Sequence, residues 1–159
     1  MTAEKLAEIL ENHKKWLAND DGFRANLSWA NLSEANLSGA DLSEAKGLLE
    51  TVNFMEAHFE CVDCGYIVYK TFGGNYEPPD EWKIEPQSII EETVNFDRCT
   101  ECGSGINVAP LEWVKREYPN KQIWKCLIEW PWLVGVCVPY NTDGKIRCSR
   151  VRLLEVVDG

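Results

Sequence analysis

The sequence is poor in the residues that most enzymes use for acid–base and nucleophilic chemistry. It has only two histidines, His13 and His58, in 159 residues. It contains no Gly-x-Ser-x-Gly elbow, no phosphate-binding loop and no glycine-rich dinucleotide turn. Adjacent carboxylates such as Glu91 and Glu92 have no neighbouring nucleophile or base in the sequence. We therefore expect a protein that is not an enzyme.

Long apolar runs are also missing. No stretch approaches the ~20 apolar residues that a membrane-spanning helix needs. Residues 1–16, MTAEKLAEILENHKKW, carry charges throughout and do not read as a signal peptide. We therefore expect a cytoplasmic protein that does not bind membranes. The seven cysteines are an odd number, which in that compartment indicates reduced thiols or a metal site rather than a disulfide framework.

The net charge of −10 is unevenly distributed along the chain. Residues 1–98 contain 8 Lys and Arg against 19 Asp and Glu, whereas residues 99–159 contain 8 against 7. Such an acidic front half disfavours direct DNA binding and suits a basic partner. The alternative is that the acidic surface only keeps the protein soluble.

Residues 23–48, FRANLSWANLSEANLSGADLSEAKGL, repeat alanine and leucine every five residues. A step of five residues rotates a helix by ~140°, which would scatter the leucines around its surface. On a strand the same step reverses the face each time. Since neither element places all the leucines on one buried face, the period indicates a solenoid that turns a corner about every five residues.

The segments RANLS, WANLS, EANLS and GADLS resemble the pentapeptide-repeat family. The resemblance implies a right-handed quadrilateral β-helix with four pentapeptides per coil, and the run here suffices for about one coil. It also implies an inward-facing set: Ala25, Leu27, Ala30, Leu32, Ala35, Leu37, Ala40, Leu42 and Ala45. The pattern stops at Gly47. One coil rises only about 4.8 Å, so this run is too short to imitate duplex DNA as long acidic rods of the family do.

Two helices are predicted beside the repeat within an N-terminal unit of residues 1–59. Residues 3–18 have helical apolar spacing with Thr2 as N-cap, and we expect this helix to cap the coil. His13 lies on its apolar face and is interpreted as a packed residue. Residues 51–59 predict a second, shorter helix that closes the other end, with His58 exposed.

Residues 60–159 predict an α+β domain with an antiparallel sheet. The expected elements are strands at 65–72, 88–94, 122–130, 132–140 and 145–157 and a helix at 110–118. A turn at 141–144 joins the last two strands. The stretches GYIVYKTFGG, ECGSGINVAPLEWV and VPYNTDGKIRCSRVRL resemble an uncharacterised C-terminal domain that accompanies short pentapeptide runs in phage and prophage proteins. No established activity comes with that resemblance.

Two Cys-x-x-Cys-Gly units predict a structural zinc site. Paired thiolates at this spacing can bind one Zn²⁺, and the following glycine permits the tight turn. The four ligands would be Cys61, Cys64, Cys99 and Cys102. The alternative is four reduced thiols with coincidental spacing; a redox role has less support because acidic neighbours disfavour the thiolate. The remaining cysteines, Cys126, Cys137 and Cys148, lie on predicted strands and are expected in the core.

A basic cluster near the C-terminus gives the second binding hypothesis. Its members are Lys145, Arg147, Arg150 and Arg152. Together with nearby tryptophans, these residues could bind an anion, a nucleotide or single-stranded DNA. The alternative is a basic solvent-facing surface that discourages edge pairing.

The leading functional hypothesis is a non-catalytic interaction protein of a phage or mobile element, located in the host cytosol. Its acidic surface would bind and inhibit a basic nucleic-acid-handling host protein, for example a defence nuclease such as a CRISPR effector. The alternative is a nucleotide- or ssDNA-binding module in the C-terminal domain. Whether the protein forms a homodimer stays open.

Overall fold

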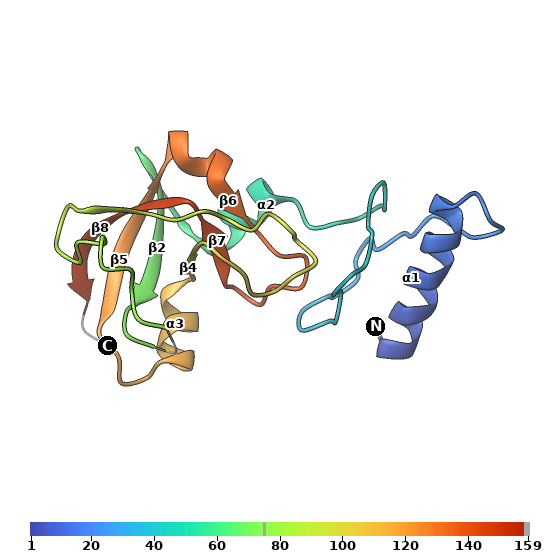
Figure 1. Ribbon diagram of the computed structural model, residues 1–159, viewed down its shortest axis with the longest axis horizontal. Coiled ribbons are helices and arrows are strands. Elements are labelled where there is room, and N and C mark those ends of the chain that lie inside the picture. Colours follow the sequence, from blue (N-terminus) through green and yellow to red (C-terminus); the bar gives the residue numbers. More distant parts are fainter. Residues whose placement is uncertain (75, 158–159) are drawn as a thin grey trace.

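The computed structural model describes residues 1–74 and 76–157. Three parts follow one another along the long axis of the molecule (Figure 1). Helix α1 (Ala3–Leu17) lies at one end and the repeat run (residues 23–46) lies in the middle. The strand-containing part, which we define as residues 51–74 and 76–157, lies at the other end. Helices combined with antiparallel sheets confirm the predicted α+β class. In these described residues no helix is long and apolar enough to cross a membrane.

Helix α1 spans Ala3–Leu17, close to the predicted bounds. The Thr2 side chain accepts a hydrogen bond from the Lys5 backbone N–H at 3.2 Å, so it satisfies one of the free donors at the helix start. Leu6 is buried against the leucines of the repeat, with Ile9 partly buried beside it. The helix therefore covers the repeat run with its apolar face, as predicted.

The larger sheet has five strands in the order β1-β2-β5-β8-β3, and every neighbouring pair is antiparallel. The strands are β1 Glu60–Val62, β2 Gly65–Thr71, β3 Ile89–Glu91, β5 Ile123–Glu129 and β8 Arg150–Val157. β2 and β5 are paired along all seven residues of each strand. The register of β5 against β8 shifts at a bulge between Lys125 and Cys126. β2 and β5, the long central strands, form the base on which the other elements pack.

The smaller sheet has three antiparallel strands in the order β4-β7-β6. They are β4 Ile106–Val108, β6 Val136–Cys137 and β7 Ile146–Cys148. Both sheets contribute to one hydrophobic core, in which Val68, Ile128 and Ile146 are fully buried. Helix α3, Leu111–Glu117, begins one residue after Pro110, which occupies the N-cap and not the first helical position.

Helix α2, Thr51–His58, was expected to close the far end of the coil, and that expectation is wrong. Its Phe54 and Met55 are buried in the core of the strand-containing part. These two large apolar side chains are stabilised by burial, and the larger of the two adjacent cores is the one in which they are buried. His58 is exposed, as predicted.

The strands predicted near the C-terminus are divided differently in the structure. Residues 130–135 form a 3-10 helix, η1 Trp130–Gly135, so only Val136–Cys137 of the predicted strand 132–140 pairs as a strand. The predicted strand 145–157 is two strands, β7 and β8, that belong to different sheets. Ser149 separates them, and its N–H bonds to the Gly135 carbonyl at 3.0 Å.

Candidate functional site

Four similar turns make up the repeat run. Each has the sequence Leu-Ser-x-Ala, and the alanine N–H donates to the leucine carbonyl three residues earlier at 2.9–3.0 Å. The third residue of each turn has positive φ while the second does not, which defines a type II turn. These third residues are Trp29 (φ 66°), Glu34 (60°), Gly39 (73°) and Glu44 (60°). The corners of the run therefore point a variable side chain outward.

The polar residue before each leucine is fixed by its own hydrogen bond. The Oδ1 atoms accept from the backbone N–H of the serine two residues later at 2.9–3.1 Å in each of Asn26, Asn31, Asn36 and Asp41. Asn and Asp are suited to this position because their short side chains reach the local backbone. Hydrogen bonds from the Ser43 side chain and backbone hold the pKa of Asp41 below its ordinary value.

The run closes on itself after four pentapeptides. Asn26 and Lys46 form a parallel bridge, and the Leu27 N–H donates to the Lys46 carbonyl at 2.7 Å. Residues twenty positions apart in the sequence therefore lie side by side, and we call the closed run of residues 25–46 the coil. Gly47 (φ 73°) lies where the next leucine was expected, because a Cβ there would be only 2.1 Å from the Ser28 nitrogen.

The inward side chains of the coil form a small core that is separate from the core of the strand-containing part. Its leucines are 1–6% exposed: Leu27, Leu32, Leu37 and Leu42. Ala25 is buried, and Ala30, Ala35, Ala40 and Ala45 are partly buried against the same cluster. Leu6 of α1 contacts this core, as do Cys99 and Tyr140 of the strand-containing part. Since α1 and the strand-containing part lie on opposite sides (Figure 1), both ends of the coil are covered.

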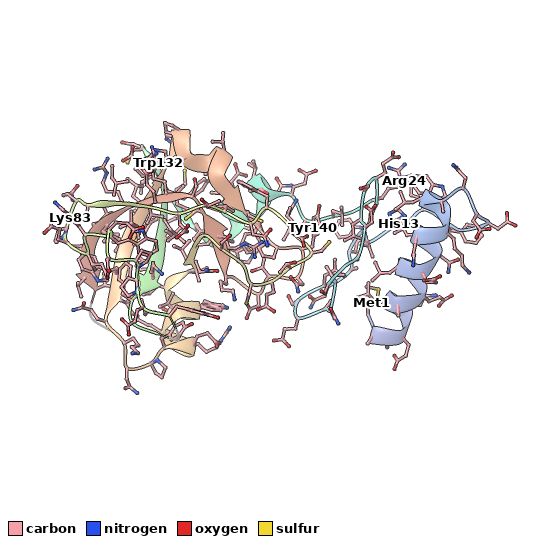
Figure 2. All side chains as sticks on the ribbon, viewed as in Figure 1. Met1, His13, Arg24, Lys83, Trp132 and Tyr140 are labelled. Atoms are coloured by element: carbon pink, nitrogen blue, oxygen red, sulfur yellow. The ribbon has the colours of Figure 1, made fainter. Side chains whose placement is uncertain are left out.

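His13 attaches α1 to the coil. It is fully buried, its Nδ1 accepts from the Ala25 N–H at 3.2 Å, and its Nε2 lies 3.0 Å from the Ser43 carbonyl. Because Nδ1 is the acceptor, Nε2 carries the proton and donates to Ser43. Figure 2 shows His13 on the side of α1 toward the repeat run. The packed role predicted for this histidine agrees with these contacts.

Two polar residues attach the coil to the strand-containing part. The Asn141 side chain donates to the Ala35 carbonyl at 2.9 Å, and the Asn141 carbonyl accepts from the Glu34 N–H at 3.2 Å. Arg98 donates to the Leu49 carbonyl and stacks 4.1 Å from the Tyr140 ring centroid. The coil is thus hydrogen-bonded to its neighbour as well as packed on it.

The outer surface of α1, the coil and the hairpin beyond α2 is strongly acidic. Residues 1–63 contain twelve Asp and Glu against five Lys and Arg. All twelve carboxylates are exposed: Glu4, Glu8, Glu11, Asp20, Asp21, Glu34, Asp41, Glu44, Glu50, Glu56, Glu60 and Asp63. Within the described chain, Glu8 is the one member with an ion pair, to Lys5 at 2.9 Å. We call this set the acidic surface.

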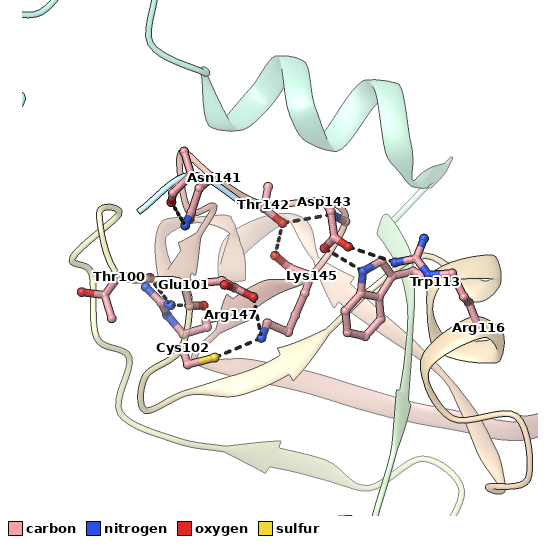
Figure 3. A network of polar contacts seen from close by, with 12 residues as sticks. Thr100, Glu101, Cys102, Trp113, Arg116, Asn141, Thr142, Asp143, Lys145 and Arg147 are labelled. Atoms are coloured by element: carbon pink, nitrogen blue, oxygen red, sulfur yellow. Dashed lines mark hydrogen bonds and ion pairs between the residues drawn. The ribbon is translucent and has the colours of Figure 1, made fainter. Parts of the chain in front are cut away.

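The predicted basic cluster is not assembled. Arg147 has no exposed surface, and its guanidinium donates to the carbonyls of residues 95, 97, 100 and 101 at 2.8–3.1 Å (Figure 3). Arg147 therefore fixes the 95–101 loop and is not available to an anion. Arg150 pairs with Glu91 at 2.8 Å, Arg152 pairs with Glu129 at 2.6 Å, and both stack on Trp132.

Lys145 contacts the same loop as Arg147, at Glu101 and Cys102. Its Nζ is 3.2 Å from the Cys102 sulfur and 3.6 Å from a Glu101 carboxylate oxygen (Figure 3). The four basic residues are therefore divided between two places: Lys145 and Arg147 at the 95–102 loop, and Arg150 and Arg152 beside Trp132. Sequence proximity suggested one surface because it could not show that β7 and β8 belong to different sheets.

The structure does not group the four thiols that were predicted to bind zinc. Cys99 is buried among the leucines of the coil, and burial raises the pKa of its thiol. Cys102 is exposed beside Lys145, and Cys61 and Cys64 are exposed in the hairpin between β1 and β2. Over residues 1–74 and 76–157, no three His, Cys, Asp or Glu side chains are grouped to hold a metal ion.

The other three cysteines are buried: Cys126, Cys137 and Cys148, as predicted. Burial raises the pKa of Cys126 to about 12, and it also raises that of Cys148. Cys126 and Cys148 therefore stay neutral and act as small apolar core residues. The Cys137 sulfur accepts a hydrogen bond from the Arg147 guanidinium at 3.2 Å.

A hollow of about 560 Å³ lies beside η1 in the strand-containing part. Glu81, Glu91 and Glu92 line it together with Trp132 and Arg150. Arg150 is already paired with Glu91. The lining therefore has an excess of negative charge, and it does not favour the phosphate groups of a nucleotide.

Comparison with known proteins identifies the repeat run. The family model described as pentapeptide repeats (8 copies) matches residues 23–46, which are 24 of the 159 residues. These residues are therefore a pentapeptide-repeat segment. No curated protein and no solved structure matches the chain. The match ends before residue 60, so the resemblance of the later residues to a phage-associated domain stays a prediction.

The sequence interpretation missed one exposed residue of the coil, Trp29. Its side chain is fully exposed, at 102% of the reference value. The signal was present in the alignment of the repeats, because position x of Leu-Ser-x-Ala is Glu, Gly and Glu in the other three turns. Trp29 is the one large aromatic residue at this position of the four turns.

Proposed function

We propose that this chain is a non-catalytic binding protein that covers and inhibits the basic surface of a nucleic-acid-handling protein. The single observation that carries the proposal is the acidic surface, in which twelve exposed carboxylates have one ion pair among the described residues. In the strand-containing part, some exposed acidic side chains, such as Glu91 and Glu117, are paired with arginine. Others, such as Glu77 and Glu85, have no ion pair among the described residues, but they lie apart from the acidic surface in the sequence. Carboxylates without internal partners are free to pair with an external basic surface.

The physical basis is electrostatic complementarity. Proteins that bind nucleic acids present clustered Lys and Arg side chains to phosphate groups. An acidic surface would be attracted to the same cluster, which raises the association rate and excludes the nucleic acid. The pentapeptide coil supports this role as a scaffold, since His13 and Asn141 fix α1 and the strand-containing part to it. A right-handed β-helical coil, as the family resemblance implies, would supply that scaffold.

The alternative function, a nucleotide- or ssDNA-binding module, has less support. It required Arg147, which is fully buried and bonded to backbone carbonyls. Arg150 and Arg152 have carboxylate partners, so binding a phosphate would first break an ion pair. We therefore keep the inhibitor of a basic protein as the proposal.

Charge reversal on α1 tests the proposal. The triple variant E4K/E8K/E11K changes three exposed carboxylates without touching the apolar face of the helix. The matched control E77K/E81K/E85K makes the same change in charge on exposed residues of the strand-containing part. Binding to purified nucleases of the host, measured by calorimetry at 50 and 300 mM salt, should weaken for the α1 variant and with added salt. Equal affinities of the wild type and both variants would contradict the proposal, as would unchanged cleavage activity in the presence of the protein.

A further inference from the structure

Trp29 places a bulky, exposed side chain at a turn position where the fold requires a positive φ but no aromatic residue. Its φ of 66° lies in the left-handed region, which is unfavourable for a bulky side chain. Its indole is fully exposed, at 102%, and contributes nothing to the core of the coil. The equivalent turn positions are occupied by Glu34, Gly39 and Glu44, so the turn itself forms without an aromatic residue.

An exposed aromatic residue in a strained position indicates a role outside the fold. Strained backbone positions persist where function gains from them. Packing cannot be the gain here, since the side chain is exposed, and glycine would suit the turn better. The remaining explanation is that the indole contacts another molecule.

We propose that Trp29 is the anchor that receives an arginine side chain of the basic partner. This inference rests on the proposed function and names the contact within the same surface. The face of an indole ring is the best aromatic acceptor for a cation, and a guanidinium is the cation that most often stacks on it. Tryptophan is also the residue most enriched in the energetic centre of protein interfaces, where arginine is its frequent counterpart.

The negative charges of the coil also favour an arginine side chain as the group that contacts Trp29. Two of the other three corners of this coil are Glu34 and Glu44, which are exposed and have no ion pair in the described chain. A guanidinium on the indole would therefore have carboxylates on the same coil to attract the rest of a basic surface. An acidic or purely apolar partner would gain nothing from these glutamates.

Hexa-arginine is a suitable probe because it supplies the guanidinium without a folded partner. Binding to the full chain is followed by NMR of the ¹⁵N-labelled indole N–H of Trp29 and by calorimetry at low salt. The indole signal should shift on titration. Trp29→Gly should bind about fourfold more weakly, which corresponds to ~0.8 kcal/mol at 1.4 kcal/mol per tenfold change. Hexa-lysine should lose less on the same substitution, because its ammonium groups stack less well on an indole.

Tyr76→Gly is the matched control, because Tyr76 is also an exposed aromatic residue, at 88%, but lies outside the coil. It should bind hexa-arginine as the wild type does. Trp29→Gly should fold normally because glycine accepts positive φ, and Trp29→Asn provides a second variant that tolerates this conformation. Thermal unfolding checks that both remain folded.

Two results separate this inference from the proposed function. If both Trp29 variants bind hexa-arginine with wild-type affinity while E4K/E8K/E11K binds more weakly, the anchor is disproved and the acidic surface stands. If the two Trp29 variants and E4K/E8K/E11K all bind hexa-arginine with wild-type affinity, both the anchor and the proposed function are contradicted. Weaker binding of both Trp29 variants, with Tyr76→Gly unchanged, supports the anchor.

Discussion

The repeat run and the strand-containing part are stabilised by different kinds of contact. In the run, every turn is closed by hydrogen bonds that span two or three residues, and one leucine per turn enters a small core. In the strand-containing part, pairs such as β5–β8 join segments far apart in the sequence over one large core. A local pattern therefore specifies the run, whereas the rest depends on the whole chain.

The same contrast holds for charged groups. The strand-containing part binds its arginines internally: Arg147 to backbone carbonyls and Arg152 to Glu129. The coil and α1 leave their carboxylates to solvent. The comparison teaches that the carboxylates without ion pairs are concentrated in the part with the simpler sequence. Under the proposed function, the strand-containing part would supply stability, and α1 and the coil would supply the surface for a partner.

Loss of the Arg147 guanidinium should have the largest effect on stability. Arg147→Met removes a buried guanidinium that donates to four carbonyls of the 95–101 loop, of which the Asp97 carbonyl alone keeps another donor, the Thr100 N–H. We expect the free energy of unfolding to fall by about 3–5 kcal/mol. Urea denaturation measures it. Arg116→Met, at an exposed ion pair with Asp143, should cost less than about 1 kcal/mol. Similar losses for both variants would show that burial of Arg147 is not what stabilises the loop.

Truncation of a coil leucine should have the next largest effect. Leu37 is 1% exposed and lies in a core of few residues, so Leu37→Ala leaves a cavity between the coil and its covers. We expect a loss of about 2–4 kcal/mol, measured by urea denaturation. The exposed neighbour variant Ser38→Ala should stay close to the wild type. A loss below 1 kcal/mol for Leu37→Ala would mean that the coil contributes little to folding.

The sequence predicted the features that depend on local contacts and missed those that depend on contacts between distant residues. The five-residue period identified the inward residues of the coil, because each turn depends only on residues such as Asn31, Leu32 and Ser33 that lie beside one another. The destination of Arg147 could not be predicted, since its partners lie about fifty residues earlier in the chain. Cys99 was assigned to a metal on local spacing, yet it packs on leucines more than fifty residues away. Trp29 was visible in the pattern but acquires meaning only with its φ and exposure.

Acid should lower the stability of the protein through Asp97, which lies in the 95–101 loop. Its carboxylate accepts from the Thr100 hydroxyl at 2.6 Å and the Cys99 N–H at 2.9 Å, and these bonds lower its pKa. A lowered folded-state pKa stabilises the protein above the unfolded value near 4, and the stabilisation is lost as the pH falls through the folded value. Asp97→Asn should therefore be less stable than the wild type at pH 7, with the difference shrinking at pH 2.5. Urea denaturation at both pH values tests this, and a constant difference would contradict it. Asp20→Asn, at an exposed position, is the control.

Metal removal should have the smallest effect, because the structure separates the thiols of the two Cys-x-x-Cys units. A chelator should leave the melting temperature unchanged, and a thiol reagent should modify Cys61, Cys64 and Cys102 quickly in the folded protein. The buried thiols, Cys99 among them, should react only on unfolding. A lower melting temperature with chelator, together with protection of Cys61 and Cys64 that the chelator abolishes, would instead show a four-thiolate zinc site. Cys99 would then have to leave the coil core, and Tyr140 would remain to cover that end of the coil. The test therefore decides whether the two parts are joined by packing, as the leucine contacts of Cys99 indicate, or by a metal.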